Sequence, residues 1–469
     1  MTDEYDVVVI GAGTGGYPAA IRAAQLGMKV ACVERRATLG GTCLNVGCIP
    51  SKALLQSTSL LSKTRSELEE HGIDVSDVSV DLDRMLARKA NVVEKLTKGV
   101  QYLLKKNGVE RVEGSARFEA NGTVRVDLAD GGTQSLSARR GTIVATGSQV
   151  AALPGVHIDE ERILSSTGAL ELQDVPEHLV VVGAGYIGLE LGSVWRRLGA
   201  KVTVIEYADG IVPSMDREIA REFEKLLRKQ GLEFRFGTKV TSAERAGKKV
   251  RINCEAVKGG DVDIVTADAL LVSIGRKAYT QGLGLDAVGV ELDERGRIPV
   301  GPRFETNIEN IFAVGDVIPG PMLAHKSTLD GVRCAEGIAG QYPGVDYNTV
   351  PSVIYTSPEV ASVGKTEEEL QAENIAYKKG TFPFSANSRA RCNGDTRGLT
   401  KILADAKTDR LLGIHIVGPE AGSIIHETVV AMEFGGSSED LALTVHAHPT
   451  LPESVKEAAL VLLGQGMHV

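Results

Sequence analysis

One pattern occurs twice in this chain and restricts its possible folds more than any other feature. Residues 6–13 read DVVVIGAG and residues 178–185 read HLVVVGAG, and each run opens a Gly-x-Gly-x-x-Gly motif. QLGMKVACVE then ends at Glu34 and RLGAKVTVIE ends at Glu206, so each acid lies 23 positions after the first glycine of its motif. A strand, a glycine-rich turn, a helix and a second strand ending in an acid are typical of a dinucleotide-binding βαβ unit. The sequence therefore predicts two such units.

The glycines of these motifs have different physical tasks. The first permits a tight turn, the second lets the backbone approach a pyrophosphate, and the third lets the helix pack on the strand. The helix N-terminus offers free N–H groups to phosphate, and the glutamate accepts hydrogen bonds from ribose hydroxyls. The alternative is two ordinary βαβ units with tight turns, but the matching acids favour two dinucleotides. The predicted phosphate-binding glycines are Gly11, Gly13 and Gly16 in the first unit and Gly183, Gly185 and Gly188 in the second.

Composition and charge exclude several classes of protein. The 469 residues are 43% hydrophobic and 24% charged, which is ordinary for a globular protein of about three domains. The formal net charge of −9 argues against nucleic acid as a partner. No apolar run is long enough to span a bilayer, and MTDEYDVVVIGAG contains no basic and apolar leader. We therefore expect a cytoplasmic protein that binds neither nucleic acid nor membrane.

Two of the six cysteines lie five positions apart in GGTCLNVGCIPSK, shortly after the first motif. Cys43 and Cys48 could form a structural disulfide, part of a metal site or a redox pair. A structural disulfide is unusual inside cells, and no further metal ligands lie nearby, so no metal site is predicted. Two thiols beside a redox cofactor can relay two electrons by thiol–disulfide exchange. Lys52 lies on the same side as Cys48 if this segment is helical, although in isolation it reads as a surface lysine.

The other four cysteines are scattered along the chain. Each is interpreted as a small buried apolar residue, an environment in which free cysteine is common. These are Cys32, Cys254, Cys334 and Cys392.

Two further segments carry polar residues that could take part in chemistry. TNIENIFAVGDV ends an apolar strand at Asp316, which could bind a polyol hydroxyl, although a helix N-cap is the favoured alternative from this feature alone. TVHAHPTLPE contains His446, His448 and Glu453. A histidine beside a carboxylate can act as the base that deprotonates a thiol, and a metal site would need a third ligand that is not evident.

Together these motifs resemble those of the pyridine nucleotide–disulphide oxidoreductases. The resemblance rests on GGTCLNVGCIPSK, the two fingerprints, ATGS, FAVGD and HAHPTLPE, and it covers essentially the whole chain in the family's motif order. It implies that the first unit binds FAD, with Glu34 at the adenosine ribose and Asp316 at the ribityl chain. It implies that the second unit binds NAD. Cys48 would be the sulfur nearest the flavin, and Cys43 the one that exchanges with substrate.

The same resemblance implies the remaining site residues. His448 and Glu453 would form the base, His446 would be structural, and Lys52 would lie by the flavin and Glu190. His325 and His426 have no catalytic task in this interpretation. Further implied FAD contacts are Lys52, Ala116, Thr146, Gly147, Ser148, Met322, Leu323, Ala324 and His325. Further implied NAD contacts are Tyr186, Ile187, Glu190, Val240 and Gly275.

The predicted fold class is α/β, with two doubly wound, Rossmann-like, three-layer domains and an α+β C-terminal dimerisation domain. We expect an FAD-binding domain at 1–147, an NAD-binding domain at 148–275 that interrupts it, and a return segment of the FAD-binding domain at 276–345. The dimerisation domain is expected at 346–469. Strands are predicted in TVPSVIYTSPEVASVG and GLTKILADAKTDRLLGIHIVG, and helices near 420–436 and 452–464.

The branch of the family that this chain resembles oxidises protein-bound dihydrolipoyl groups to the lipoyl disulfide and reduces NAD+ to NADH. The implied partners are a second copy of the chain, which shares each active site, and a lipoylated carrier. That carrier would belong to the acyltransferase core of a 2-oxo acid dehydrogenase complex or to the glycine cleavage system.

Other functions remain as alternatives. A glutathione-type reductase generally uses NADPH and should show arginine after Glu206, but IEYADG has none. A mercuric reductase should show a C-terminal cysteine pair, but the last cysteine is Cys392. A non-enzymatic role is retained only as a secondary function.

Three segments depart from the family pattern. Pro18 follows the first fingerprint, where it is tolerated only in the first helical turn, and we expect it there. AHKSTLDG lacks the usual acidic run over residues 327–330, and SIGRKAYTQGLG differs over residues 277–279 from a segment that commonly carries two arginines and a proline.

Overall fold

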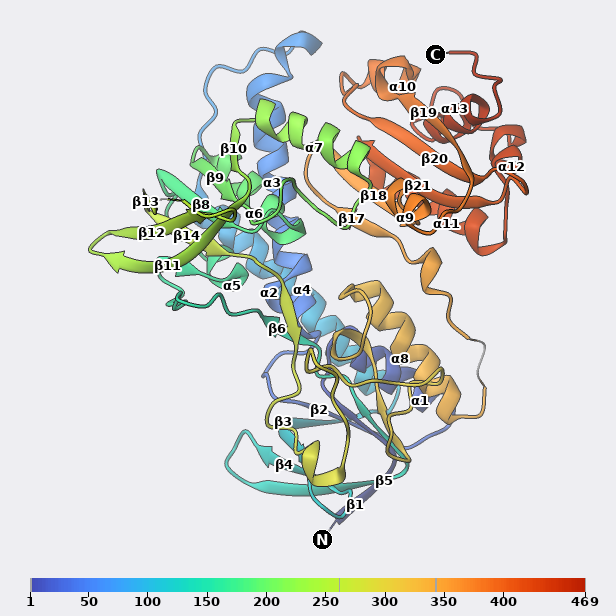
Figure 1. Ribbon diagram of the computed structural model, residues 1–469. Helices are drawn as coiled ribbons and strands as arrows, with labels where there is room; N and C mark the ends of the chain where they lie inside the picture. Colours follow the sequence, from blue (N-terminus) through green and yellow to red (C-terminus); the bar gives the residue numbers. More distant parts are fainter. Residues whose placement is uncertain (1, 261, 342–343, 469) are drawn as a thin grey trace. The chain divides into compact units, whose positions relative to one another are not determined.

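The computed structural model describes residues 2–260, 262–341 and 344–468. The chain forms two compact units, each assembled from three separate segments (Figure 1). The first unit comprises residues 1–53, 83–151 and 275–345, and the second comprises residues 54–82, 152–274 and 346–469. The chain therefore leaves the first unit after Ala151 and returns to it at Gly275.

The first unit is built on a six-stranded sheet. Its order is β1-β2-β3-β4-β5-β16, and β1 also pairs with β5. β1 runs parallel to β2 and β5, whereas β4 is antiparallel to both of its neighbours. The strands are β1 (Thr2–Ile10), β2 (Val30–Glu34), β3 (Glu110–Phe118), β4 (Val124–Leu128), β5 (Thr133–Val144) and β16 (Ile311–Ala313). The helices of this unit include α1 (Gly16–Gln25), α2 (Gly41–Val46), α4 (Leu82–Lys106) and α8 (Ala324–Ile338).

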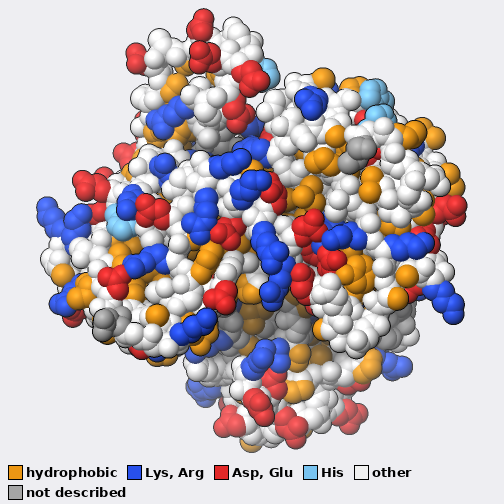
Figure 2. Space-filling model, turned by 45° about the horizontal axis from the view of Figure 1, so that its top comes forward, with side chains coloured by type: hydrophobic (Ala, Val, Ile, Leu, Met, Phe, Trp, Pro, Cys, Tyr) orange, Lys and Arg blue, Asp and Glu red, His pale blue; other side chains and the backbone are white. Residues whose placement is uncertain are grey.

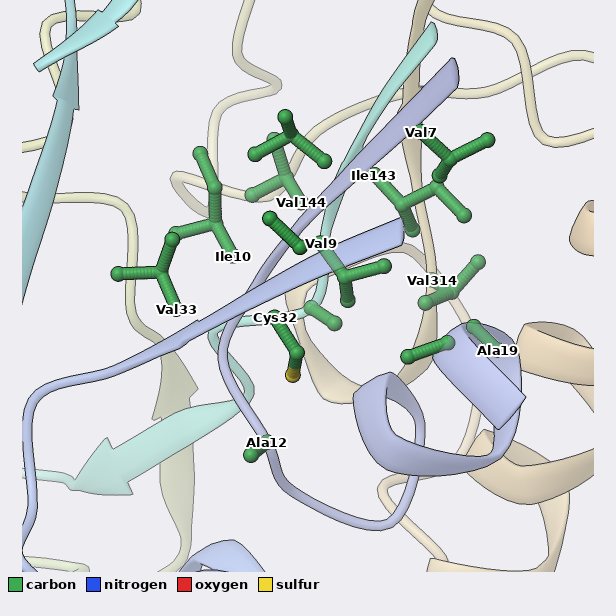
Figure 3. Close-up of a cluster of buried hydrophobic side chains, with 14 of the residues drawn as sticks. Val7, Val9, Ile10, Ala12, Ala19, Cys32, Val33, Ile143, Val144 and Val314 are labelled. Atoms are coloured by element: carbon green, nitrogen blue, oxygen red, sulfur yellow. The ribbon is translucent and has the colours of Figure 1, made fainter. Parts of the chain in front are cut away.

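The inner strands of this sheet are buried on both faces. Val7, Val8 and Val9 of β1 are fully buried, which explains why β1 reads as a continuous apolar run rather than an alternating one. Figure 3 shows β1 side chains packed among residues of β2, β5 and α1, including Cys32 and Ala19. Pro18 is the third residue of α1, so it lies in the first turn as predicted.

The second unit contains a parallel sheet of order β10-β9-β8-β14-β7. Its strands are β7 (Ile163–Leu164), β8 (His178–Val182), β9 (Lys201–Ile205), β10 (Leu232–Arg235) and β14 (Ala269–Val272). A three-stranded antiparallel sheet adjoins it, formed by β11 (Thr238–Ala246), β12 (Lys249–Ala256) and β13 (Asp263–Ala267). The helices of this part are α5 (Ser166–Ala169), α6 (Tyr186–Leu198) and α7 (Arg217–Lys229).

The C-terminal part of the second unit is α+β, as predicted. Its antiparallel sheet has the order β17-β18-β21-β20-β19, with strands β17 (Ser352–Ile354), β18 (Glu359–Gly364), β19 (Tyr377–Pro383), β20 (Leu399–Asp405) and β21 (Leu411–Gly418). Its helices are α9 (Glu367–Ala372), α10 (Ser388–Cys392), α11 (Ala421–Glu433), α12 (Ser438–Leu443) and α13 (Glu453–Leu462). The strands and helices expected from the sequence are present, whereas β19, α9, α10 and α12 were not predicted.

Two short strands lie where the chain leaves and re-enters the first unit. β6 (Ser148–Val150) pairs antiparallel with β15 (Arg276–Ala278), so the outgoing and returning chain form one ribbon. The segment 277–279, which departs from the family pattern, is part of this ribbon. The helix α3 (Cys48–Ser66) begins in the first unit and ends in the second.

The prediction for the scattered cysteines is right for three and wrong for one. Cys32, Cys254 and Cys334 are buried. Cys392 is exposed at the end of α10, where its neighbours Arg391 and Asn393 are exposed as well. A short surface helix rich in arginine offers no apolar surroundings in which this side chain could be buried.

Charges of both signs share the molecular surface. Across the face drawn in Figure 2, lysines and arginines are interspersed with aspartates and glutamates. Within the described ranges, no helix is long and apolar enough to cross a membrane.

A buried cation joins α7, α9 and the C-terminal sheet within the second unit. Lys401 of β20 is fully buried, and its Nζ lies 2.9 Å from Asp216 Oδ2 and 2.5 Å from Glu367 Oε2. Glu218 lies 3.0 Å from the same ammonium. Burial alone would raise the pKa of Asp216, but His415 and Lys401 hold that pKa below its ordinary value. Its stabilising effect is therefore complete at neutral pH and is lost as the pH falls through the lowered pKa.

We expect Lys401→Met to destabilise the protein by about 3–5 kcal/mol, because it leaves buried carboxylates without their cation. Lys379→Met is the matched control, since Lys379 contacts Glu218 and Glu367 but is 40% exposed. Its loss should cost below about 1 kcal/mol. Scanning calorimetry of both variants measures the difference, and equal shifts of the unfolding temperature would contradict this account of the cluster.

Candidate active site

The two predicted redox cysteines lie on consecutive helices, α2 and α3, which Gly47 separates. Gly40 precedes α2 with a φ of 92°, and Gly47 breaks the helix before α3 begins at Cys48. Both cysteine side chains are partly buried. A hydrogen bond to Cys48 and burial raise the pKa of the Cys43 thiol, whereas Lys52 acts in the opposite direction. The two sulfurs are therefore adjacent, with a cation within electrostatic range.

The helical segment also places Lys52 as expected. It lies four residues after Cys48 within α3, so both side chains fall on the same side of this helix. A nearby cation favours the thiolate, which is the reactive form, over the thiol.

Two further residues interact electrostatically with the cysteines and could not be identified from the sequence. Burial and the negative charge that Cys43 can carry raise the pKa of Tyr17 on α1. Burial lowers the pKa of Arg276, while Asp316 and Cys48 act against this change. Arg276 therefore links the cysteine pair electrostatically to the predicted ribityl-binding acid, and all of these residues belong to the first unit.

The first glycine motif forms an open cradle. Gly11 has a φ of 101°, and a Cβ there would lie 2.5 Å from Ala145 O, so only glycine fits without strain. The N-terminus of α1 has no side-chain cap and no acid in its first turn. The positive end of the helix dipole at this N-terminus suits a pyrophosphate. Buried Glu34 lies at the end of β2, where its Oε2 accepts a hydrogen bond from Ala12 N at 2.8 Å.

Asp316 accepts hydrogen bonds from the hydroxyl groups of two serines, one distant in sequence and one on α8. Its Oδ2 accepts from Ser148 Oγ at 2.6 Å, and its Oδ1 accepts from Ser327 Oγ at 3.2 Å. The N-cap alternative is wrong, because Asp316 lies inside a 3₁₀ turn, Gly315–Val317, whose N-cap is Val314. A carboxylate positioned by hydroxyl donors suits the binding of a polyol.

Residues of α8 stabilise the backbone next to Asp316. Lys326 and Asp330 form a fully buried ion pair at 2.7 Å, and Asp330 Oδ2 accepts from Gly315 N at 3.1 Å. Asp330 therefore has a structural role, although the segment 327–330 lacks the family's acidic run.

The other predicted FAD contacts also belong to the first unit, and their roles stay predictions. Ala116 lies on β3, and Thr146 donates its hydroxyl to Tyr279 O at 2.7 Å. Gly147 has a φ of 71° between β5 and β6. Residues 322–325 lead into α8, whose first turn has no side-chain cap.

The second glycine motif repeats the geometry of the first. Gly183 has a φ of 102°, and a Cβ there would lie 2.5 Å from Ser273 O. The N-cap of α6, Gly185, leaves the helix N-terminus without a side-chain cap. Glu206 Oε2 accepts from Ala184 N at 2.7 Å, as Glu34 does from Ala12.

The remaining predicted NAD contacts lie on several different elements, and their roles stay predictions. Tyr186 and Ile187 begin α6, Val240 is buried on β11, and Gly275 precedes β15 with a φ of 122°. Glu190 is buried in α6, where its Oε1 accepts from Tyr355 N at 3.0 Å. The predicted approach of Lys52 to Glu190 joins the two units and stays a prediction.

The predicted base has its carboxylate partner in place. His448 Nδ1 lies 2.9 Å from Glu453 Oε1, and Glu453 Oε2 accepts from Thr450 N at 2.7 Å. Burial alone would raise the pKa of Glu453, but Thr450 N–H and His448 hold that pKa below its ordinary value. The His448 side chain is 69% exposed, and its role as a base stays a prediction.

The other histidines of the prediction lie in different surroundings. The His446 side chain is only 6% exposed and faces Glu427 rather than Glu453. His325 lies in the first turn of α8 and His426 lies on α11.

Comparison with known proteins agrees with this arrangement. The family described as pyridine nucleotide-disulphide oxidoreductase matches residues 5–331, and its dimerisation domain matches residues 350–459. This chain belongs to that family. The predicted family and fold class are therefore confirmed, including the two Rossmann-like domains and the C-terminal dimerisation domain.

Several relatives match over almost the whole chain. Mitochondrial dihydrolipoyl dehydrogenase 1 of Arabidopsis thaliana is 53% identical, covering 100% of this chain and 92% of its own. The mitochondrial dihydrolipoyl dehydrogenase of Bos taurus is 52% identical over 97% and 90%. The leghemoglobin reductase of Vigna unguiculata is 54% identical over 98% and 88%. The crystal structure of LpdA from Mycobacterium tuberculosis has a TM-score of 0.90 at 27% identity, covering 98% of this chain and all of its own.

Proposed function

We propose that this protein is a dihydrolipoyl dehydrogenase, which oxidises protein-bound dihydrolipoyl groups to the lipoyl disulfide and passes the electrons to NAD+. The observation that carries the proposal is the pair of adjacent thiols, Cys43 and Cys48, with Lys52 on the same side of α3. The identity of 52–53% with dihydrolipoyl dehydrogenases over nearly the whole chain supports it.

The chain offers fitting sites for FAD and NAD. Each glycine motif leaves a helix N-terminus without a side-chain cap, which suits a pyrophosphate, and each is followed by an acid that suits a ribose. Glu34, Ser148 and Asp316 would hold FAD, and Glu206 would hold NAD. When bound, FAD accepts two electrons from the cysteine pair and NAD+ is the final hydride acceptor.

The proposed exchange follows from the chemistry of the protein's own residues. In the oxidised protein, Cys43 and Cys48 form a disulfide. His448 Nε2 takes the proton of one dihydrolipoyl thiol, and the resulting thiolate attacks Cys43 Sγ. The Cys43–Cys48 bond breaks, and its electron pair stays on Cys48 as a thiolate, which the charge of Lys52 favours. Glu453 stabilises the imidazolium that forms.

The second half of the exchange releases the product. The remaining lipoyl thiol loses its proton to solvent and attacks the lipoyl sulfur that is bound to Cys43. The lipoyl disulfide forms, and Cys43 leaves with the electron pair and accepts a proton from the His448 imidazolium. The substrate is oxidised by two electrons and the cysteine pair is reduced by two.

The assembly that we propose is a homodimer, which the match to the dimerisation domain supports. Each active site would take its cysteines from one subunit and His448 from the other, as two-fold symmetry permits for both sites at once. The proposed substrate carriers are the acyltransferase core of a 2-oxo acid dehydrogenase complex or the glycine cleavage carrier. A cytoplasmic location stays a prediction from the sequence.

Mixed subunits test the sharing of the active site. In a heterodimer of Cys43→Ser and His448→Gln subunits, one shared site carries both defects and the other carries neither. We therefore expect such a heterodimer to recover about half of the wild-type lipoamide activity. Subunit exchange followed by activity assay measures this recovery. An inactive mixture, with the heterodimer confirmed by mass spectrometry, would rule out sharing.

A direct assay tests the reaction itself. The purified protein should be yellow, and it should reduce NAD+ with dihydrolipoamide as electron donor. Glutathione disulfide with NADPH and mercuric ion with NADPH are the comparison reactions. Turnover of either comparison substrate without turnover of dihydrolipoamide would overturn the proposal in favour of a reductase.

Nucleotide preference provides a separate prediction for Glu206. We expect kcat/KM for NADH to exceed that for NADPH by at least about 100-fold, because a 2′-phosphate would face the Glu206 carboxylate. Glu206→Gln should narrow this ratio, whereas Glu34→Gln in the first motif should not. Equal values for the two nucleotides in the wild-type protein would place Glu206 away from the ribose.

A further inference from the structure

A chain of hydrogen bonds runs from Arg276 to the predicted ribityl-binding acid. Arg276 is the first residue of β15, where its Nε donates to Ser148 Oγ at 2.7 Å and its Nη2 donates to the carbonyl oxygen of Ser148 at 2.8 Å. Ser148 Oγ in turn donates to Asp316 Oδ2 at 2.6 Å. All three residues belong to the first unit, and the proposed reaction gives Arg276 no task.

The guanidinium of Arg276 decides the direction of these bonds. Arginine has N–H donors and no acceptor, so its bond to Ser148 Oγ occupies a lone pair of that oxygen. The hydroxyl hydrogen of Ser148 is then left for Asp316. Without such a donor, a serine hydroxyl rotates to suit whichever acceptor is near. Arg276 therefore holds the Ser148 hydroxyl in the orientation in which it donates to the carboxylate.

The second donor to Asp316 is less firmly directed. Ser327 Oγ lies 3.2 Å from Asp316 Oδ1 and 3.0 Å from the carbonyl oxygen of Leu323. A hydroxyl has a single hydrogen, so Ser327 divides it between two acceptors. The bond from Ser148 is thus the shorter and better directed of the two. Because a carboxylate offers about four lone-pair sites, Asp316 keeps further acceptors for the hydroxyls of a polyol.

Burial, charge and register agree with a specific task for Arg276. Its side chain is half-buried, and burial lowers its pKa, whereas the charges of Asp316 and Cys48 oppose that change. In the antiparallel ribbon Arg276 pairs with Val150, so its side chain reaches diagonally across to Ser148. Lys277, the next residue, is exposed and points to the opposite face of the ribbon.

We propose that Arg276 is a positioning residue for FAD, which orients the Ser148 hydroxyl and thereby fixes Asp316 to accept hydrogen bonds from the ribityl chain. The inference rests on the proposed function, in which Asp316 binds that chain. It gives a role in cofactor binding to a residue that no motif in the sequence indicated. Because Arg276 acts through Ser148, removing the guanidinium and removing the hydroxyl should weaken FAD binding by the same route.

The release of FAD from the holoenzyme tests this role, with recovery of flavin fluorescence as the measurement. We expect Arg276→Met and Ser148→Ala each to weaken FAD binding by about 10-fold, the usual effect of losing one hydrogen bond to a charged group. The double variant should also lose about 10-fold rather than about 100-fold, because either single change already breaks the relay. Arg276→Lys keeps the charge without the two-pronged contact, so it should bind FAD closer to Arg276→Met than to wild type. It also carries the test if Arg276→Met does not fold.

Lys277→Met is the matched control, since it removes a positive charge from the adjacent residue on the opposite face, and it should bind FAD as wild type does. Analogues of FAD that each lack one ribityl hydroxyl separate positioning from a general loosening of the fold. For the analogue without the hydroxyl that bonds Asp316, wild type and Arg276→Met should bind equally well.

Three results would overturn the inference. One is a loss of about 100-fold in the double variant, which would mean that Arg276 and Ser148 act independently. Another is the same ratio of wild-type to Arg276→Met affinity for FAD and for every analogue. The third is wild-type FAD binding in both Arg276 variants. Because FAD binding is measured without turnover of dihydrolipoamide, failure of the proposed reaction would be recognised separately, in the activity assay.

Discussion

Cys43→Ser and Cys48→Ser are each expected to abolish lipoamide-dependent turnover while FAD stays bound. Either change removes one sulfur of the disulfide that receives electrons from the dihydrolipoyl thiols, and a hydroxyl cannot replace it. Electron transfer from NADH to an artificial acceptor should largely survive, because that route does not use the cysteine pair. Parallel assays of the two activities, with the flavin content measured by absorbance, check the expectation.

Cys392→Ser is the matched control for these variants. Cys392 is exposed at the end of α10, outside the first unit that carries the pair, so its substitution should leave both activities unchanged. Substantial lipoamide activity in Cys43→Ser or Cys48→Ser would show that these cysteines are not the redox pair.

His448→Gln should slow dihydrolipoamide oxidation by about 10²–10⁴-fold, the usual contribution of general acid–base catalysis. Glutamine cannot accept the thiol proton, although it can still donate a hydrogen bond to Glu453 in place of the Nδ1 contact. The effect should appear in kcat/KM across the accessible pH range.

His446→Gln is the comparison for this variant. It should retain most of the activity, because His446 contacts Glu427 rather than Glu453. If instead His446→Gln were inactive and His448→Gln active, the base would be His446 and not His448.

The fold of the two βαβ units could be predicted because their constraints are local. The turn at Gly11, the apolar run of β1 and the acid at Glu34 all lie within one short stretch of sequence, and the same holds for the second unit. The C-terminal elements were harder to predict. β19 contains a glycine and a proline, and α12 has only six residues, which a capping box of Ser437 and Asp440 holds in place.

Residues whose environment depends on distant segments could not be predicted from sequence. Arg276 donates a hydrogen bond to Ser148 Oγ at 2.7 Å, although the two residues are 128 positions apart in the sequence. Asp316 accepts a hydrogen bond from the hydroxyl of Ser148, which is 168 positions away. The N-cap alternative for Asp316 seemed favoured only because those donors are invisible in the local sequence. Similarly, nothing near Cys392 in sequence indicated that the fold would leave it exposed.

The cysteine pair itself was predictable because its signal is a local motif, and the structure adds the adjacency of the two sulfurs. The Glu427 partner of His446 lies on a separate helix, so this contact appears only in three dimensions.

The state of Cys43 and Cys48 during a single turnover tests the central claim most directly. The wild-type protein would be mixed under anaerobic conditions with one equivalent of dihydrolipoamide, either alone or followed by NAD+, and only then alkylated and analysed by mass spectrometry. We predict that both cysteines are alkylated in the sample that received dihydrolipoamide alone. In the sample that also received NAD+, neither should be alkylated, because the two cysteines have formed a disulfide again. If NAD+ is reduced while the alkylation of this pair never changes, the electrons do not pass through Cys43 and Cys48, and the account is wrong.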